Sequence, residues 1–78
     1  MSKEMEDEAI DCAVLGVMKH TDYLEIAKYI KDKFNDKYGN YWCCIVGPPT
    51  FGATYHYKPN HYISFELDQL CILLFKTP

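Results

Sequence analysis

The apolar positions at the start of the chain follow the pattern of an amphipathic helix. They recur at helical spacing from Met5 to Val17 and predict a helix over about residues 3–19. Ser2 suits the N-cap of this helix, and the acidic residues of its first turns favour the positive end of the helix dipole. Residues 13–18 are apolar on nearly every side, so we expect the second half of the helix to be well buried.

A second helix is predicted over about residues 22–38. Ile26, Ile30 and Phe34 follow one another at steps of four and give it an apolar stripe. Asp22, with a glutamate three residues later, is typical of a capping box, and a glycine directly follows the last turn.

The rest of the chain is aromatic and β-branched and is divided by turn-forming residues. It predicts four strands, over about 41–46, 51–57, 61–67 and 70–76. Their short connections favour antiparallel neighbours. The sequence therefore predicts one α+β domain over residues 1–78, in which two N-terminal helices pack on a four-stranded antiparallel sheet.

Two of these strands, 41–46 and 70–76, are apolar on both faces. A strand of that kind must be covered on both faces, and two helices of this length cover about one face of a four-stranded sheet. A twofold homodimer is the simplest way to cover the other face. It would also stabilise a chain of 78 residues, which by its size buries only about 60% of its unfolded surface.

Composition narrows the function further. The net charge is −3, and the basic residues are all lysines, so neither the arginines nor the basic surface typical of nucleic-acid recognition is present. No apolar run approaches the roughly 20 residues that span a membrane, and the N-terminal residues do not resemble a signal peptide. We therefore expect a cytosolic chain with reduced thiols, without nucleic acid or membrane as partner.

Cysteine and histidine are the only side chains that suggest a metal site or a thiol nucleophile. Adjacent Cys43 and Cys44 point to opposite faces of a strand, and no pair of candidate ligands has the spacing usual for zinc. Either thiol can be imagined beside His56, but no glycine-rich nucleophile turn adjoins them. We expect no catalytic residue, no metal ligand and no cofactor. The candidates considered were Cys12, Cys43, Cys44, Cys71, His56 and His61.

The segment 51–57 has the character of an edge strand. Gly52 permits a close approach of another backbone, and Pro49 and Pro59 flank the segment, as prolines do at sheet edges. Such a strand is either part of a dimer interface or a template on which an incoming peptide strand pairs. The residue pattern alone supports both interpretations equally.

Several blocks of the chain resemble the light-chain-8 family of dynein light chains, in the same order and at near-matching spacing. Residues 31–38 look like its second-helix signature, and 42–47 match its tryptophan-x-cysteine-isoleucine-valine-glycine strand. Phe51-Gly52 matches the start of its edge strand, and residues 61–69 and 72–76 follow in step. The resemblance covers essentially the whole chain.

The resemblance implies a non-catalytic, strand-exchanged homodimer in the cytoplasm, associated with a microtubule motor. Strand 51–57 would cross to the partner's sheet, and peptides from the dynein intermediate chain or other disordered proteins would add along its edge, beside the second helix. Two parallel grooves would raise the effective concentration of the second peptide. The implied groove residues are Phe51, Gly52, Ala53, Thr54, Tyr55, His56, Tyr57, Tyr23, Leu24, Ser64 and Glu66. The implied dimer-interface residues are Cys43, Thr54, Tyr55, His56 and Tyr57.

This chain departs from the family pattern at the groove. Tyr23-Leu24 replaces an acidic-basic pair that reads a glutamine of the peptide, and Ser64 and Glu66 stand where the family presents tyrosines. Cys43 stands at an interface position that is commonly histidine. We expect a preference for an apolar residue in place of the glutamine and for a basic group near Glu66. The alternative is a divergent structural or regulatory dimer with an altered peptide ligand or none.

Overall fold

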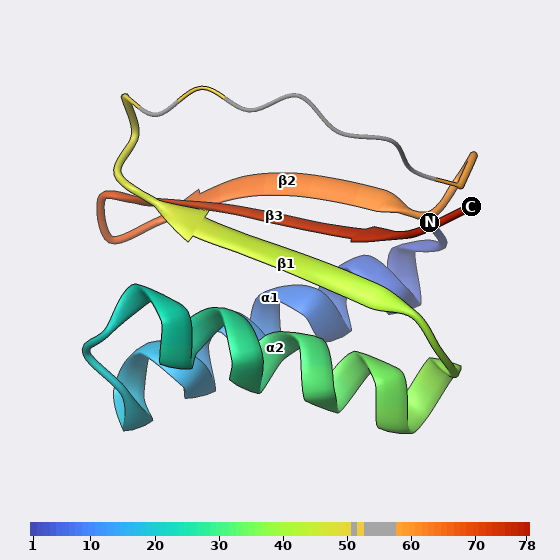
Figure 1. The fold of residues 1–78 in the computed structure, drawn as a ribbon, viewed down its shortest axis with the longest axis horizontal. Coiled ribbons are helices and arrows are strands. Elements are labelled where there is room, and N and C mark those ends of the chain that lie inside the picture. The colour runs from blue at the N-terminus through green and yellow to red at the C-terminus, as the bar shows by residue number, and fades with distance from the viewer. Residues whose placement is uncertain (51, 53–57) are drawn as a thin grey trace.

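In the computed structural model, two helices are followed by three strands of one antiparallel sheet (Figure 1). The structure describes residues 1–50, 52 and 58–78, so the predicted strand over 51–57 lies outside the described residues. The other predicted elements occur within one residue of their expected bounds. The elements are α1 (Lys3–Lys19), α2 (Tyr23–Tyr38), β1 (Trp42–Gly47), β2 (Tyr62–Leu67) and β3 (Leu70–Lys76).

The two helices lie side by side on one face of the sheet (Figure 1). The strand order is β1-β3-β2, so β3 is the central strand and β1 and β2 occupy the two edges. Both pairings are antiparallel, with Cys44 opposite Leu74 in one and Ile63 opposite the same leucine in the other. α2 packs beneath β1, and α1 packs against α2 and β2.

Side-chain caps begin both helices, as the sequence predicts. The Ser2 hydroxyl oxygen accepts a hydrogen bond from the Met5 amide at 3.2 Å, and an Asp22 carboxylate oxygen accepts one from the Leu24 amide at 2.9 Å. Asp22 therefore caps the second residue of α2 and not the third, which differs from the bond expected in a capping box. Gly39 ends α2 with a φ of 83° and a ψ of 168°, a positive φ that favours glycine but differs from the left-handed helical cap that was expected.

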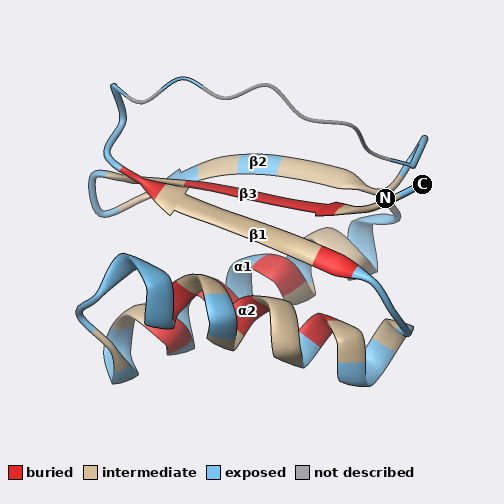
Figure 2. Cartoon of the chain, viewed as in Figure 1, coloured by how far each residue is buried: buried red, intermediate tan, exposed pale blue. Residues whose placement is uncertain are grey.

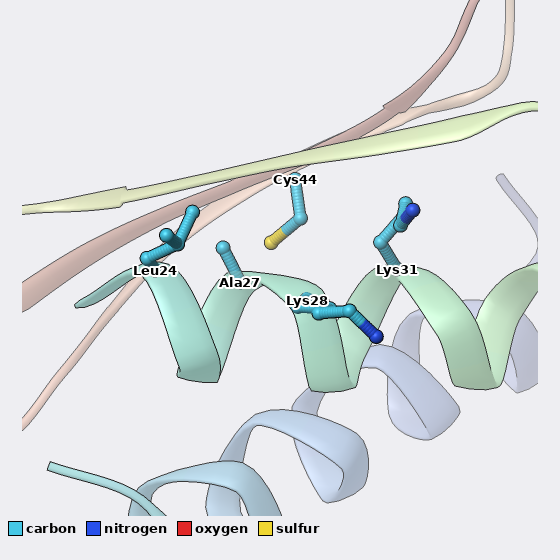
Figure 3. Close-up of a pocket in the computed structure, with 5 residues that line it drawn as sticks. All are labelled: Leu24, Ala27, Lys28, Lys31 and Cys44. Carbon is cyan, nitrogen blue, oxygen red and sulfur yellow. The ribbon is translucent and has the colours of Figure 1, made fainter. Parts of the chain in front are cut away.

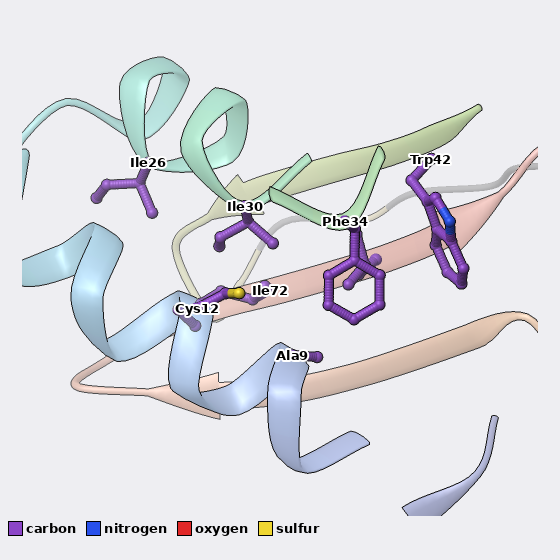
Figure 4. Packing of buried hydrophobic residues seen from close by; sticks show 9 residues of the cluster. Ala9, Cys12, Ile26, Ile30, Phe34, Trp42 and Ile72 are labelled. Carbon is purple, nitrogen blue, oxygen red and sulfur yellow. The ribbon is translucent and has the colours of Figure 1, made fainter. Parts of the chain in front are cut away.

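The core lies between the helices and the facing side of the sheet (Figure 4). Phe34 and Trp42 are its largest fully buried side chains. α1 approaches α2 closely at Gly16, where an added Cβ would lie 3.3 Å from Cδ1 of Tyr29. The buried residues of the cluster are Ala9, Cys12, Ala13, Ile26, Ile30, Phe34, Trp42, Ile72 and Leu74.

The second half of α1 is not buried all round, so that prediction was wrong. Ala13 and Gly16 are buried, but Val14 and Leu15 are partly exposed and Met18 is 77% exposed. Figure 2 shows exposed residues along the outer side of both helices. Among the described elements α1 packs against α2 and β2, and its outer apolar residues remain exposed.

A two-residue turn joins β2 to β3, and neither of its residues is glycine. Asp68 and Gln69 have φ values of 50° and 66°, and Leu67 pairs with Leu70 across the turn. Positive φ at both central residues fits the right-handed twist of the two strands.

Among the residues that the structure describes, no helix is long and apolar enough to cross a membrane.

Candidate functional site

The candidate site is a hollow between α2 and the edge strand β1 (Figure 3). It has a volume of about 260 Å3, and Cys44 points into it from β1 toward the helix. The lining residues are Leu24, Ala27, Lys28, Lys31 and Cys44.

The spacing of four α2 residues explains why they line one hollow. Leu24, Ala27, Lys28 and Lys31 are three or four residues apart, so they share one side of the helix. Leu24 is 71% exposed at the first turn, which leaves an uncovered apolar side chain at the entrance. The hollow therefore combines apolar surface from Leu24, Ala27 and Cys44 with two lysines.

The two lysines share one acidic partner. Asp32 lies 2.9 Å from Nζ of Lys28 and 3.4 Å from Nζ of Lys31. Its hydrogen bond raises the pKa of Lys28, and that bond, with a smaller contribution from Lys31, lowers the pKa of Asp32. The positive charges of the two lysines at the hollow are therefore offset in part by Asp32, and that of Lys28 also by Glu25.

The thiol in the hollow is a poor nucleophile. Burial raises the pKa of Cys44 to about 12, with a smaller contribution from the neighbouring Cys43. Because the thiolate is the reactive form, Cys44 stays neutral near pH 7 and acts as apolar surface.

The backbone beside the hollow is open for pairing. The Thr77 amide donates to the Tyr41 carbonyl at 3.1 Å, which sets the alternation of hydrogen bonds along β1 and β3. By that alternation Cys43 and Ile45 bond to β3, while the amide and carbonyl groups of Cys44 point away from it. Within the described part of the chain, β1 pairs with β3 alone. An edge of this kind can accept a further strand.

The face of the sheet away from the helices is also apolar. Leu73 and Phe75 of β3 are buried there, and Cys43 and Ile45 of β1 are half-buried beside them. β1 and β3 are therefore apolar on both faces, as the sequence indicates.

The structure does not bring all four divergent groove residues together within one chain. Tyr23 and Leu24 lie at the start of α2, on the side of the sheet where β1 forms the edge. Ser64 and Glu66 are exposed on β2, which forms the opposite edge, and they alternate with residues that face the helices. A groove containing both pairs would have to be shared by two chains.

Of the predicted edge-strand residues, the structure describes Gly52 alone, and it is exposed. The other predicted residues of that segment lie outside the described residues: Phe51, Ala53, Thr54, Tyr55, His56 and Tyr57. Sequence analysis missed the contribution of Ala27, Lys28, Lys31 and Cys44 to the hollow. Their spacing from Leu24 on α2 was a usable signal for the first three, but the contact with Cys44 depends on how α2 crosses β1.

The candidate thiol and histidine sites are dispersed. Cys12 is buried in α1, where burial, followed by the charge of Glu8, raises its pKa. The His61 ring lies 2.8 Å from the Pro59 carbonyl oxygen and packs near Trp42. In the described ranges, no three histidine, cysteine, aspartate or glutamate side chains gather as metal ligands.

The comparisons with known proteins agree with this geometry. Residues 1–77 match the family model described as dynein light chain type 1. A solved structure of the dynein light chain-like domain of a Fasciola hepatica calcium-binding protein superposes with a TM-score of 0.87 at 22% identity, over 100% of this chain and 84% of that one. A mercury derivative of the same domain gives a TM-score of 0.79 at 21% identity, with the same coverage. The family match over nearly the whole length shows that the chain belongs to the dynein light chain family, type 1.

Proposed function

We propose that two copies of this chain form a non-catalytic hub that binds short peptide segments of the dynein intermediate chain or of other disordered proteins. The observation that carries the proposal is the edge of β1 beside the hollow of α2, which pairs with β3 alone among the described strands. The dynein light chain family is generally non-catalytic, which agrees with a binding role. The proposed location is the cytoplasm, on a microtubule motor.

Two features support a dimer. The second face of β1 and β3 is apolar, and Leu24 lies far from Glu66 across the sheet of one chain. In the proposed dimer, segment 51–57 of each chain crosses to the sheet of the other, and Cys43 lies at the interface. The peptide then adds along that crossed strand, so each groove is built from both chains.

In binding by strand addition, different groups supply the affinity for a peptide and the preference for its sequence. Backbone hydrogen bonds to an edge strand are tolerant of sequence, whereas the side chains around the groove select the peptide. Leu24, Ala27 and Cys44 give apolar surface where the family reads a glutamine. We propose that the preferred peptide carries an apolar side chain at that position. Two such grooves in one dimer bind two copies of a partner with a raised effective concentration.

Light scattering followed by calorimetric titration tests this function. We expect the mass of a dimer and saturation at one peptide per chain, with a leucine-centred peptide binding more tightly than the glutamine-centred one. Leu24→Gln should weaken or reverse that preference without changing the mass. Met18→Gln, at a similarly exposed residue of α1, is the matched control and should change neither. A monomer that binds neither peptide would contradict the proposal.

A separate variant tests the dimer interface. Ile45→Lys places a charge on the face of β1 away from the helices. If that face is the dimer interface, the unpaired buried charge should weaken the dimer by about 3–5 kcal/mol. We expect this variant to lose the dimer mass and peptide binding together. Retention of the dimer mass would show that this face is not the interface.

Glu66 tests the second preference. We propose that its exposed carboxylate favours a basic group in the peptide. Glu66→Gln should then reduce the ratio of affinities for a lysine-containing peptide and its neutral counterpart. An unchanged ratio would show that the charge of Glu66 does not contribute to peptide preference.

A second candidate function is a structural or regulatory dimer with altered peptide recognition or none. Tyr23 and Leu24 favour this candidate. Both are exposed at the groove entrance, and neither offers the charged groups with which the family reads a glutamine. A dimer that ignores both the glutamine-centred and the leucine-centred peptide would support this candidate.

A further inference from the structure

The outer side of α1 carries an apolar surface that the proposed groove does not use. Ile10, Val14 and Met18 lie four residues apart and form one row along the helix, with exposed fractions of 40%, 39% and 77%. Leu15 is 46% exposed beside them. The opposite side of the same helix holds the buried residues of the core, so α1 is apolar on two sides and covered on one.

An acidic row borders this apolar row. Asp7 and Asp11 precede Leu15 at steps of four and therefore share its side of the helix. Among the described residues, Asp7 has only the exposed Lys3 as an ion-pair partner, at 3.5 Å, and Asp11 has none. α1 as a whole contains five acidic residues and two lysines, a balance of −3 that equals the net charge of the chain.

We propose that the outer face of α1, formed by Asp7, Ile10, Asp11, Val14, Leu15 and Met18, binds a basic amphipathic helix of a partner protein. The apolar row fits the apolar stripe of such a helix, and lysines or arginines beside that stripe would meet the aspartates. The site is separate from the groove between α2 and β1 and does not depend on peptide binding there.

Charge favours this occupant over two others. A second copy of α1 would bring two acidic rows together, and like charges in an interface oppose association. An anionic membrane surface would repel the same aspartates. A basic amphipathic helix can bury its apolar stripe on the apolar row and pair its cations with the acidic row.

The test titrates a synthetic helical peptide, with leucine and lysine at amphipathic spacing, into the full chain while backbone amide shifts are followed by NMR. We expect the shifts to concentrate on α1. The double variant V14Q/M18Q should weaken binding at least about tenfold, since it removes most of the apolar row. D7N/D11N should weaken binding less and make it less sensitive to salt.

Controls separate this site from the groove and from non-specific attraction. Leu24→Gln changes a side chain that is as exposed as Met18 but lies at the groove, and it should leave binding of the basic peptide unchanged. The same peptide with glutamate in place of lysine should not shift the amide signals of α1. Both double variants change exposed residues, and circular dichroism should show that their helices are intact.

Several results would overturn the proposal. They are equal binding by V14Q/M18Q, shifts that map to α2 and β1, and equal binding of the glutamate peptide. Concentration-dependent self-association that V14Q/M18Q abolishes would assign the surface to a second copy. Binding of the chain to neutral phospholipid vesicles that the same variant abolishes would assign it to a membrane.

Discussion

Phe34 and Trp42 meet edge to face, with 4.9 Å between their ring centroids and 75° between their ring planes. Phe34 lies in the last turns of α2, and Trp42 is the first residue of β1, so this contact holds the helix to the strand that forms one wall of the hollow. Both side chains are buried, and aromatic pairs in this geometry contribute beyond the area they bury.

Removal of the Phe34 ring should therefore destabilise the whole chain. We expect Phe34→Ala to lower the free energy of unfolding by about 3–5 kcal/mol, and Phe34→Leu to lower it less. Urea unfolding at a fixed protein concentration measures both. Leu24→Ala, at an exposed residue of the same helix, should stay within about 0.5 kcal/mol of the unmodified chain. A Phe34→Ala chain as stable as that control would show that the ring is not part of the core.

A hydrogen bond also joins α2 to β1. The side-chain carbonyl oxygen of Asn35 accepts from the Trp42 amide at 2.8 Å. Asn35→Ala leaves that amide without its acceptor and should cost about 1 kcal/mol, with faster hydrogen exchange at Trp42. Asn35→Asp keeps an acceptor and should retain the slow exchange. Equal exchange in all three chains would mean that the bond does not protect this amide.

The close contact at Gly16 limits what can stand there. Alanine gains about 1 kcal/mol of helix propensity over glycine, but its Cβ would lie 3.3 Å from Cδ1 of Tyr29. Because these effects oppose each other, we expect Gly16→Ala to change the free energy of unfolding by less than about 1 kcal/mol. Gly16→Leu should destabilise by about 1–3 kcal/mol, because the helices must separate. Thermal unfolding of the two variants compares them, and a leucine variant as stable as the alanine one would refute the close packing.

The buried thiol of Cys44 should make stability depend on alkaline pH. Its pKa is about 12 in the folded chain, against an ordinary value of 9.0. Between these values the unfolded chain loses the proton and the folded chain keeps it, so the free energy of unfolding falls as the pH rises. Below pH 9.0 the thiol is protonated in both states and contributes no slope.

The Cys44→Ala variant isolates this contribution. It should be less stable overall, since it removes a buried sulfur, but its stability should fall less steeply above pH 9.0. Urea unfolding below and above that pH measures both slopes. Parallel slopes would show that the thiol ionises equally easily in the folded and unfolded chain.

The helices were predictable because their signals are local. Ser2 and Asp22 cap them in the structure as they do in the pattern, and the steps of four from Ile26 to Phe34 mark the buried side of α2. Periodicity failed for α1, because Val14 and Met18 extend the apolar pattern around the helix. When nearly all positions are apolar, the pattern does not indicate which side meets the core.

The candidate site was only partly predictable, because it depends on contacts between distant segments. Leu24 was expected at the groove and lines the hollow, but its contact with Cys44 follows from the crossing of α2 and β1. Ser64 and Glu66 were expected in the same groove as Leu24 in a dimer; within one chain they lie at the other edge of the sheet, so their place in that groove stays a prediction. That separation follows from the strand order, in which β3 lies between β1 and β2.

The turn between β2 and β3 has a consequence for what holds this hairpin together. Asp68 and Gln69 both adopt positive φ, a conformation that is uncommon for residues other than glycine, asparagine, aspartate and histidine. Gln69 is not among the residues that favour this conformation, so the turn sequence specifies the hairpin less strongly than a glycine at that position would. The apolar pairs of the strands, Leu67 with Leu70 and Phe65 with Ile72, hold the turn in place. The register of the hairpin therefore depends on these apolar pairs, and a change to either pair should loosen the turn as well as the strands.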